Sequence, residues 1–466
     1  MSERFSSPLR LKRIFFWTRL VCILVLGGFA LRLLEWNRDV DPRFFRFLST
    51  TPGKTLARVM NWPNLYDQTR VEKPLEEYSE EERYWRQEIE SNLQSTWPTH
   101  TLEFRDGRVK NVQVLAFGND QLHILENFGP KGRLETIIDR VNVRNIKPYE
   151  TSIPEVTWRD VRFQMEYPTF ELTHSGGYTV LTDAPYYQVS SSVQALKHLR
   201  SQYLDIFSPL VRFPKKEESL QLLFFTREEE YRRHQKNTAP LLENSIGYYS
   251  PLEDRMVLFN HQYSKRTQAV RQHVKEEVNE LSRTTSSEKE QKRLRHLHQR
   301  LESHIRDQAS METLSTLRHE GAHYLSYTYG VHSWIHTENA WLIEGLAAYF
   351  ESATPGASIS SYNQSLWKME TQGRVPTLER LLSVRLPADF TSVMPEIKAH
   401  EAYALSWSLF RFCMQEPRRE AFFAYLRYLQ EPEDIPTLME TPRVLLLSNA
   451  LSLTPDELEK DWKSSW

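Results

Sequence analysis

The sequence predicts an α+β protein in which a small all-β module precedes a larger domain that combines a mixed sheet with a helical half. Three observations support this fold class. Short strand-like segments separated by turn residues fill 98–150, with no helical spacing between them. From about 165 onward, apolar residues recur at both strand and helix spacing. A basic leader and an apolar stretch, within 1–36, come before both and predict an N-terminal membrane helix.

Composition narrows the class of protein further. The chain has 466 residues, 40% of them hydrophobic and 12% aromatic, which is enough for folded cores and argues against disorder. With 59 Lys and Arg against 61 Asp and Glu, the net charge is −2, and we expect no nucleic-acid partner. The two cysteines, Cys22 and Cys413, are too few for a disulfide framework or a cysteine-based zinc site. A metal would therefore need His, Asp or Glu ligands.

The amino terminus predicts a membrane anchor. Residues 1–13 form a basic cytoplasmic leader, and 14–36 are long enough to span a bilayer as a signal anchor. The rest of the chain would then lie outside the cytoplasm, in the periplasm if the source is bacterial. Two alternatives stay open at this stage. Cleavage at Gly28-Phe29-Ala30 would remove the segment as a signal peptide, and a buried apolar helix would not span the bilayer.

Residues 37–97 are polar and acidic, and they predict a charged helical stalk between membrane and folded body. The next segment, 98–150, predicts a small antiparallel barrel or roll. Asp106 and Gly107 supply a hairpin turn there, and five short strands surround it. No catalytic constellation is present in this module, so we interpret it as a spacer or a binding module.

The larger domain is predicted over 165–466. It begins with a hairpin, a helix at 187–207 and a buried strand at 220–225, and a second hairpin ends in Met256–Phe259. Residues 264–308 are charged and carry only weakly spaced leucines. They predict a helical hairpin inserted before the next core helix, either a solvated structural feature or an arm that binds a partner.

One motif carries the chemistry. His319-Glu320-Gly-Ala-His323 places two imidazoles at helix positions i and i+4, on one face and one turn apart. Two such imidazoles can bind one zinc ion, and the glutamate between them can hold a water molecule beside it. By itself the motif also fits an amphipathic helix with solvated His and Glu side chains.

A third ligand strengthens the metal hypothesis. Glu344 follows His323 by 21 positions and lies in a segment whose apolar residues predict a buried helix. A buried carboxylate is costly unless it is paired or binds a metal, and catalytic zinc takes three protein ligands. Glu351, two turns further on, either orients one of the histidines or ends the helix in solvent.

His319-Glu-x-x-His323 followed by Trp341-Leu-x-Glu344-Gly-x-Ala-x-Tyr349-x-Glu351 resembles the gluzincin zinc metallopeptidases, in particular the poorly characterised bacterial peptidase-MA-like domains. The resemblance covers about 165–466. It implies a gluzincin-type fold in which His319, His323 and Glu344 bind zinc and Glu320 is the general base. The metzincin pattern does not fit, because Ser326 and Tyr329 stand where that family has glycine and histidine. Two nearby loop histidines, His332 and His336, either contact substrate or metal or are simply exposed.

Gluzincins often supply a tyrosine or histidine to the oxyanion, and the resemblance makes Tyr403 a candidate, although a structural core tyrosine fits equally well. The predicted function is zinc-dependent hydrolysis of a peptide or protein substrate that lies extended along Met256–Phe259 as a sheet edge. Two alternatives are a membrane-anchored scaffold that binds without cutting and a zinc hydrolase of a non-peptide amide. The sequence determines neither substrate nor oligomeric state.

Overall fold

The computed structural model describes residues 74–127, 133–175, 177–184, 186–214, 219–239, 245–250, 253–284, 287–332, 339–430 and 441–466. Over these residues the protein is a mixed α+β structure with two five-stranded sheets and 14 α-helices. No helix within them is long and apolar enough to cross a bilayer. The predicted leader at 1–13 and the predicted anchor at 14–36 lie outside the described residues.

The first sheet confirms the five short strands predicted for the small module. Its order is β4-β3-β2-β1-β5, so the two edge strands are consecutive in the chain. Only the short 3₁₀ turn Arg140–Asn142 joins them, a reach of about 14 Å, whereas five flat strands span about 19 Å. The sheet must therefore curl toward a barrel around Leu102, Leu122 and Ile124. The strands are β1 (His100–Phe104), β2 (Val109–Phe117), β3 (Gln121–Asn127), β4 (Arg133–Asp139) and β5 (Val143–Pro148).

The second sheet is the centre of the larger body and has the order β6-β7-β8-β10-β9. Strands β7, β8 and β10 are parallel, and each edge strand is antiparallel to its neighbour. Alternate residues enter different cores, as the two-residue period of a strand requires. Leu222 and Phe224 face one core, and Leu223 and Phe225 face the other. The strands are β6 (Glu171–Ser175), β7 (Tyr178–Thr182), β8 (Leu220–Phe225), β9 (Gly247–Ser250) and β10 (Arg255–Phe259).

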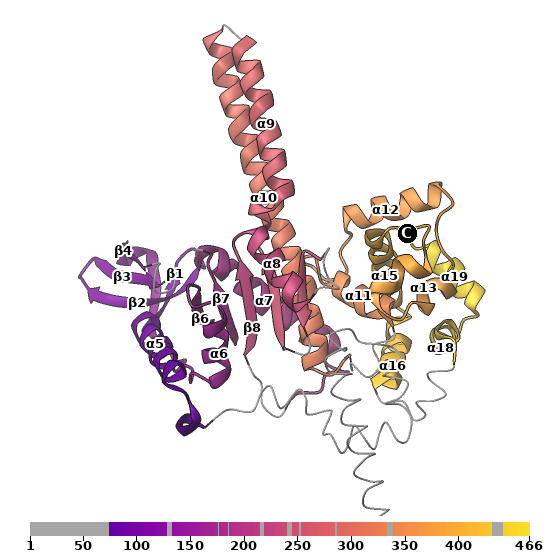
Figure 1. Ribbon diagram of the computed structural model, residues 1–466, viewed down its shortest axis with the longest axis horizontal. Coiled ribbons are helices and arrows are strands. Elements are labelled where there is room, and N and C mark those ends of the chain that lie inside the picture. The colour runs from indigo at the N-terminus through magenta and orange to yellow at the C-terminus, as the bar shows by residue number, and fades with distance from the viewer. Residues whose placement is uncertain are drawn as a thin grey trace, which may run out of the picture.

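Helices cover both faces of this sheet (Figure 1). One face packs against α7 and α10, and the other against α5, α6 and α8. Tyr78, Ile89 and Leu93, from the expected stalk, are buried in the second core beside Phe163. The stalk prediction is therefore wrong for 74–97, because this segment is part of the folded body. These helices are α5 (Glu80–Thr96), α6 (Trp158–Glu166), α7 (Tyr186–Phe207), α8 (Glu228–Thr238) and α10 (Glu288–Thr328).

The expected substrate edge is also corrected. Met256–Phe259 lies inside the sheet, because β10 pairs with β8 on one side and with β9 on the other. The edge strand on this side is β9, although its first three residues are buried. Gly247 allows β9 to approach α10 closely, since a Cβ there would lie 2.7 Å from the Cγ2 of Thr316.

The predicted helical hairpin is present but is not a separate insertion. Helix α9 (Lys265–Thr284) and the first half of α10 form an arm that projects from the body (Figure 1). The sequence predicted that the hairpin ends at 308. Instead α10 runs unbroken for 41 residues and carries the His319 motif in its second half.

The C-terminal half is helical and shares its core with α7 and α10. Trp341, Trp407 and Trp462, from three helices of this half, are among its largest buried side chains. This half contains α11 (Ala340–Tyr349), α12 (Ser360–Thr371), α13 (Leu378–Ser383), α14 (Phe390–Val393), α15 (Ala399–Cys413), α16 (Arg419–Gln430), α18 (Arg443–Ala450) and α19 (Pro455–Lys463).

Candidate metal centre

The three predicted ligands come together between α10 and α11. Gly321, inside the motif, lets α10 lie against α7, since a Cβ there would come within 2.7–2.8 Å of two leucine methyl groups. Helix α11 is buried along nearly its whole length, and Glu344 within it is only 5% exposed. His319, His323 and Glu344 offer ligand atoms within 4.8 Å of one another.

The geometry of these atoms matches a tetrahedral ion. The Nε2 atoms of His319 and His323 are 3.2 Å apart. The Oε2 atom of Glu344 lies 3.1 Å from the first nitrogen and 3.7 Å from the second. A tetrahedral ion with bonds of about 2.0–2.1 Å holds its ligand atoms about 3.3 Å apart. The group could therefore hold a metal ion with little rearrangement.

The charges of the site also fit a cation. Burial opposes ionisation of Glu344, but the imidazoles of His323 and His319 outweigh it and lower the pKa of that carboxyl to about 2. Burial likewise opposes protonation of His319, yet its bonds to Glu344 and Glu351 raise its pKa well above the usual value. A buried site that favours positive charge so strongly is well matched to a divalent ion.

Glu351 orients His319 from behind. Its Oε1 atom lies 2.8 Å from Nδ1 of His319, which leaves Nε2 directed at the metal position. The hydroxyl of Tyr362 donates to the same oxygen at 2.8 Å. Such a carboxylate–histidine pair fixes the tautomer and the ring orientation of a ligand. Of the two alternatives for Glu351, the structure has the histidine partner. The contact with Tyr362 was not predicted, because no local pattern in the sequence points to it.

Glu320 lies on the side of α10 that faces the sheet edge. Its Oε2 atom accepts a hydrogen bond of 2.9 Å from the backbone N–H of Tyr249 in β9. Burial is the main reason that the pKa of Glu320 is raised above its ordinary value. A carboxylate with a raised pKa is a better proton acceptor near neutral pH. Sequence reasoning missed Tyr249, because a contact across 71 positions leaves no local pattern.

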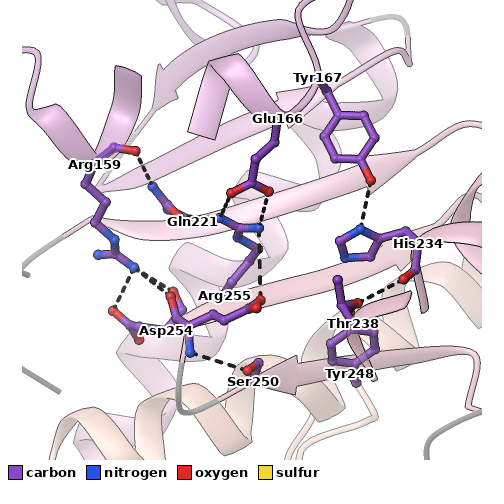
Figure 2. A network of polar contacts seen from close by, with 11 residues as sticks. Arg159, Glu166, Tyr167, Gln221, His234, Thr238, Tyr248, Ser250, Asp254 and Arg255 are labelled. Carbon is purple, nitrogen blue, oxygen red and sulfur yellow. Dashed lines mark hydrogen bonds and ion pairs between the residues drawn. The ribbon is translucent and has the colours of Figure 1, made fainter. Parts of the chain in front are cut away.

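A polar network surrounds the turn between β9 and β10. Figure 2 shows the part of it in which Arg159 contacts Asp254. Asp254, at the turn with φ of +47°, is buried and pairs with Arg159 at 3.2 Å. The hydroxyl of Tyr249 donates to the other carboxylate oxygen of Asp254 at 2.9 Å. Tyr249 is thus fixed at its side chain by Asp254 and at its N–H by Glu320. The network therefore helps to keep the edge strand in register with the motif helix.

Tyr403 lies beside the ligands, on α15. Its ring centroid is 6.0 Å from that of His319. Gly345 permits this approach, because a Cβ there would come within 2.5 Å of the carbonyl oxygen of Ser406 in α15. The negative charge of Glu344, together with burial, raises the pKa of Tyr403 well above 10, so its hydroxyl keeps its proton and can donate.

Of the two loop histidines, His332 is buried rather than exposed, and burial lowers its pKa to about 3. Neither its Nε2 atom nor the Nδ1 atom of His323 has a hydrogen-bond partner among the described residues. No contact places His332 among the metal ligands. His336 falls outside the described residues.

Comparison with known proteins gives a family of unknown function. A family described as "Protein of unknown function (DUF1570)" matches residues 313–435. The match begins just before the motif of α10 and extends past Tyr403, so it contains all three predicted ligands. A search of curated proteins finds no match.

Proposed function

We propose that the protein is a zinc-dependent peptidase of the gluzincin type. The observation that supports this most directly is the triangle of His319 Nε2, His323 Nε2 and Glu344 Oε2, with sides of 3.1–3.7 Å. The donor set of two imidazoles and one carboxylate suits zinc and leaves a fourth position open.

The residues around the triangle supply the remaining chemistry. A zinc ion bound there would act as a Lewis acid that activates water and polarises the scissile carbonyl. Glu320, with its raised pKa, takes the proton of the attacking water and delivers it to the leaving amine. Tyr403, held in its protonated form, donates a hydrogen bond to the developing oxyanion.

The substrate would lie along β9. This strand is an edge, and Tyr249 points its N–H at the general base rather than at β10. An extended peptide could pair with such an edge through its main chain, which favours a peptide or protein substrate. With the anchor expected at 14–36, the reaction would take place at the membrane and outside the cytoplasm.

The test is the full-length protein with and without its general base. We expect about one zinc ion per chain, cleavage of members of a peptide library, and retained zinc in Glu320→Gln with turnover reduced by a factor on the order of 10²–10⁴. Glu302→Gln, on the exposed half of the same helix, is the matched control and should keep full activity.

The other outcomes separate the alternatives. Undiminished turnover of Glu320→Gln would remove this residue from the mechanism. Bound zinc without cleavage of any peptide would favour a membrane-anchored scaffold that binds without cutting. Cleavage of a non-peptide amide alone would favour a zinc hydrolase of such amides.

A further inference from the structure

Two arginines are buried among the described residues, and only one has a counter-charge. The guanidinium of Arg255 makes contacts of 2.6 and 3.0 Å with the carboxylate of Glu166. Arg318, only 4% exposed, donates instead to the carbonyl oxygen of Phe350 and to the amide oxygen of Gln202. A buried charge is costly unless an opposite charge compensates it. Arg318 therefore has two neutral hydrogen-bond acceptors but no negative charge that would offset the cost of burying its guanidinium.

Arg318 lines a cavity of about 510 Å³ between α7, α10 and the segment 351–359. This volume lies within the range of small-molecule sites. Its other walls are largely apolar and include Ala195, Met311, Leu314 and Ile359. Apolar surface therefore dominates the cavity, and the polar residues that line it beside Arg318 are Glu351, His198 and three serines.

The cavity lies on the far side of α10 from β9. At 100° per residue, Leu314 and Arg318 project about 160° away from Thr316 and Glu320, which face the sheet edge. One acid, Glu351, also lines the cavity, but its Oε1 atom is engaged by His319 and Tyr362. The cavity is therefore separate from the side on which a substrate would pair with β9.

We propose that this cavity binds a small ligand with a carboxylate head and an apolar body. A guanidinium has five N–H donors, and Arg318 uses two of them within the protein. Its Nη1 atom makes no hydrogen bond within the described part of the chain, and this atom is not completely buried. Nη1 can therefore meet a carboxylate, and a two-bond pairing with it would be the strongest contact in the cavity. The apolar body would replace water along Leu314 and Ile359.

The experiment compares octanoate with octanamide, which has the same chain and no charge. Calorimetric titration uses the full-length protein carrying Glu320→Gln, so that catalysis has no part in the readout. We expect saturable binding of one octanoate per chain, at least tenfold tighter than that of octanamide.

Two variants locate the site. Arg318→Met keeps the apolar stem and removes the charge, and it should weaken octanoate at least tenfold while octanamide changes little. Leu314→Trp fills the cavity and should abolish binding of both, whereas Leu297→Trp, on the exposed arm of the same helix, should leave both unchanged. If Arg318→Met does not fold, the octanoate preference and the tryptophan pair still decide. Equal binding of octanoate and octanamide, or octanoate binding that survives Leu314→Trp, would overturn the proposal.

Discussion

The two halves of α10 belong to one continuous helix and have opposite surroundings. From 288 to 308 no side chain is buried, and the helix runs beside α9 in the projecting arm (Figure 1). From Ala309 onward the helix is inserted between the sheet, α7 and α11, and most of its side chains are buried. The charged composition of the first half therefore marks the part of α10 against which the body of the protein does not pack, although the helix itself is continuous.

The difference explains where chemistry can occur. The arm has histidines of its own, including His296 and His298, but two positions on a helix place these on different faces, whereas His319 and His323 share one face. On the arm, His298 lies 3.9 Å from Glu302, and no buried metal-type cluster is found there among the described residues. His319 is fixed on both nitrogens by carboxylates in a buried setting. The metal group therefore depends on two features that the arm lacks: histidines on one helix face, and a second buried helix that brings the carboxylate of Glu344 to them.

The largest expected effect separates the two halves by metal content. His319→Ala should reduce bound zinc from about one ion per chain to near zero, since a two-ligand site binds poorly. His296→Ala, on the arm, should leave the metal content unchanged. Elemental analysis of the purified proteins measures both. Equal metal content in both variants would place the ion elsewhere in the molecule.

A smaller effect separates the halves by stability. Leu317→Ala removes a fully buried side chain and should lower the free energy of unfolding by about 2–5 kcal/mol. Leu297→Ala, at 45% exposure on the arm, should cost less than about 1 kcal/mol. Denaturant unfolding gives both values. A cost above 2 kcal/mol for Leu297 would mean that the arm is covered in solution.

The sequence predicts best what depends on short spacing. The strands of the small module, both hairpins of the larger sheet, and the helix positions of His319, Glu320 and His323 all follow from local periods and turn residues. Glu344 was found because a carboxylate inside an apolar helix needs an explanation. Each of these signals lies within about ten residues.

What the sequence could not predict depends on long-range packing. The position of β10 inside the sheet follows from pairing with β8, about 35 positions earlier in the chain, and made the expected edge wrong. The burial of 74–97 depends on contacts with α6 and β6. The contacts from Tyr249 to Glu320 and from Tyr362 to Glu351 join separate elements. The continuity of α10 was the one local feature that a change in composition concealed.

Ion pairs of the two environments should differ in their pH dependence. Glu401 is 3% exposed and is paired with Arg374. The hydrogen bonds from Arg374 lower the pKa of the Glu401 carboxyl to about 2. The unfolded chain then binds more protons between about pH 4.5 and 2, so this stabilisation is present above that window and is lost as the pH falls through it. Allowing for partial exposure of Arg374, we expect Glu401→Gln to cost about 2 kcal/mol at pH 7 and to flatten the acid limb of the stability curve.

The pair Arg271–Glu302 on the arm is the matched control. Its closest contact is 3.5 Å and both side chains are partly exposed. Glu302→Gln should therefore cost less than about 1 kcal/mol and leave the acid limb unchanged. Urea unfolding at several pH values measures the free energy of unfolding of both variants. If this free energy depends on acid pH equally steeply in the two variants, the pKa assigned to Glu401 is contradicted.

The smallest effect is expected from shortening the arm. The contact of Arg271 with Glu302 places residues 274 and 299 at the same level of the hairpin, so a short glycine–serine turn can replace 275–298. This segment touches neither the sheet nor the predicted ligands. Metal content and cleavage of short peptides should therefore stay within about twofold of the intact protein, and the thermal midpoint within a few degrees. If cleavage of short peptides persists but cleavage of a folded protein substrate is lost, the arm binds the substrate and is not merely a solvated structural feature. A loss of metal would instead show that the two halves of α10 are coupled, which their separate surroundings argue against.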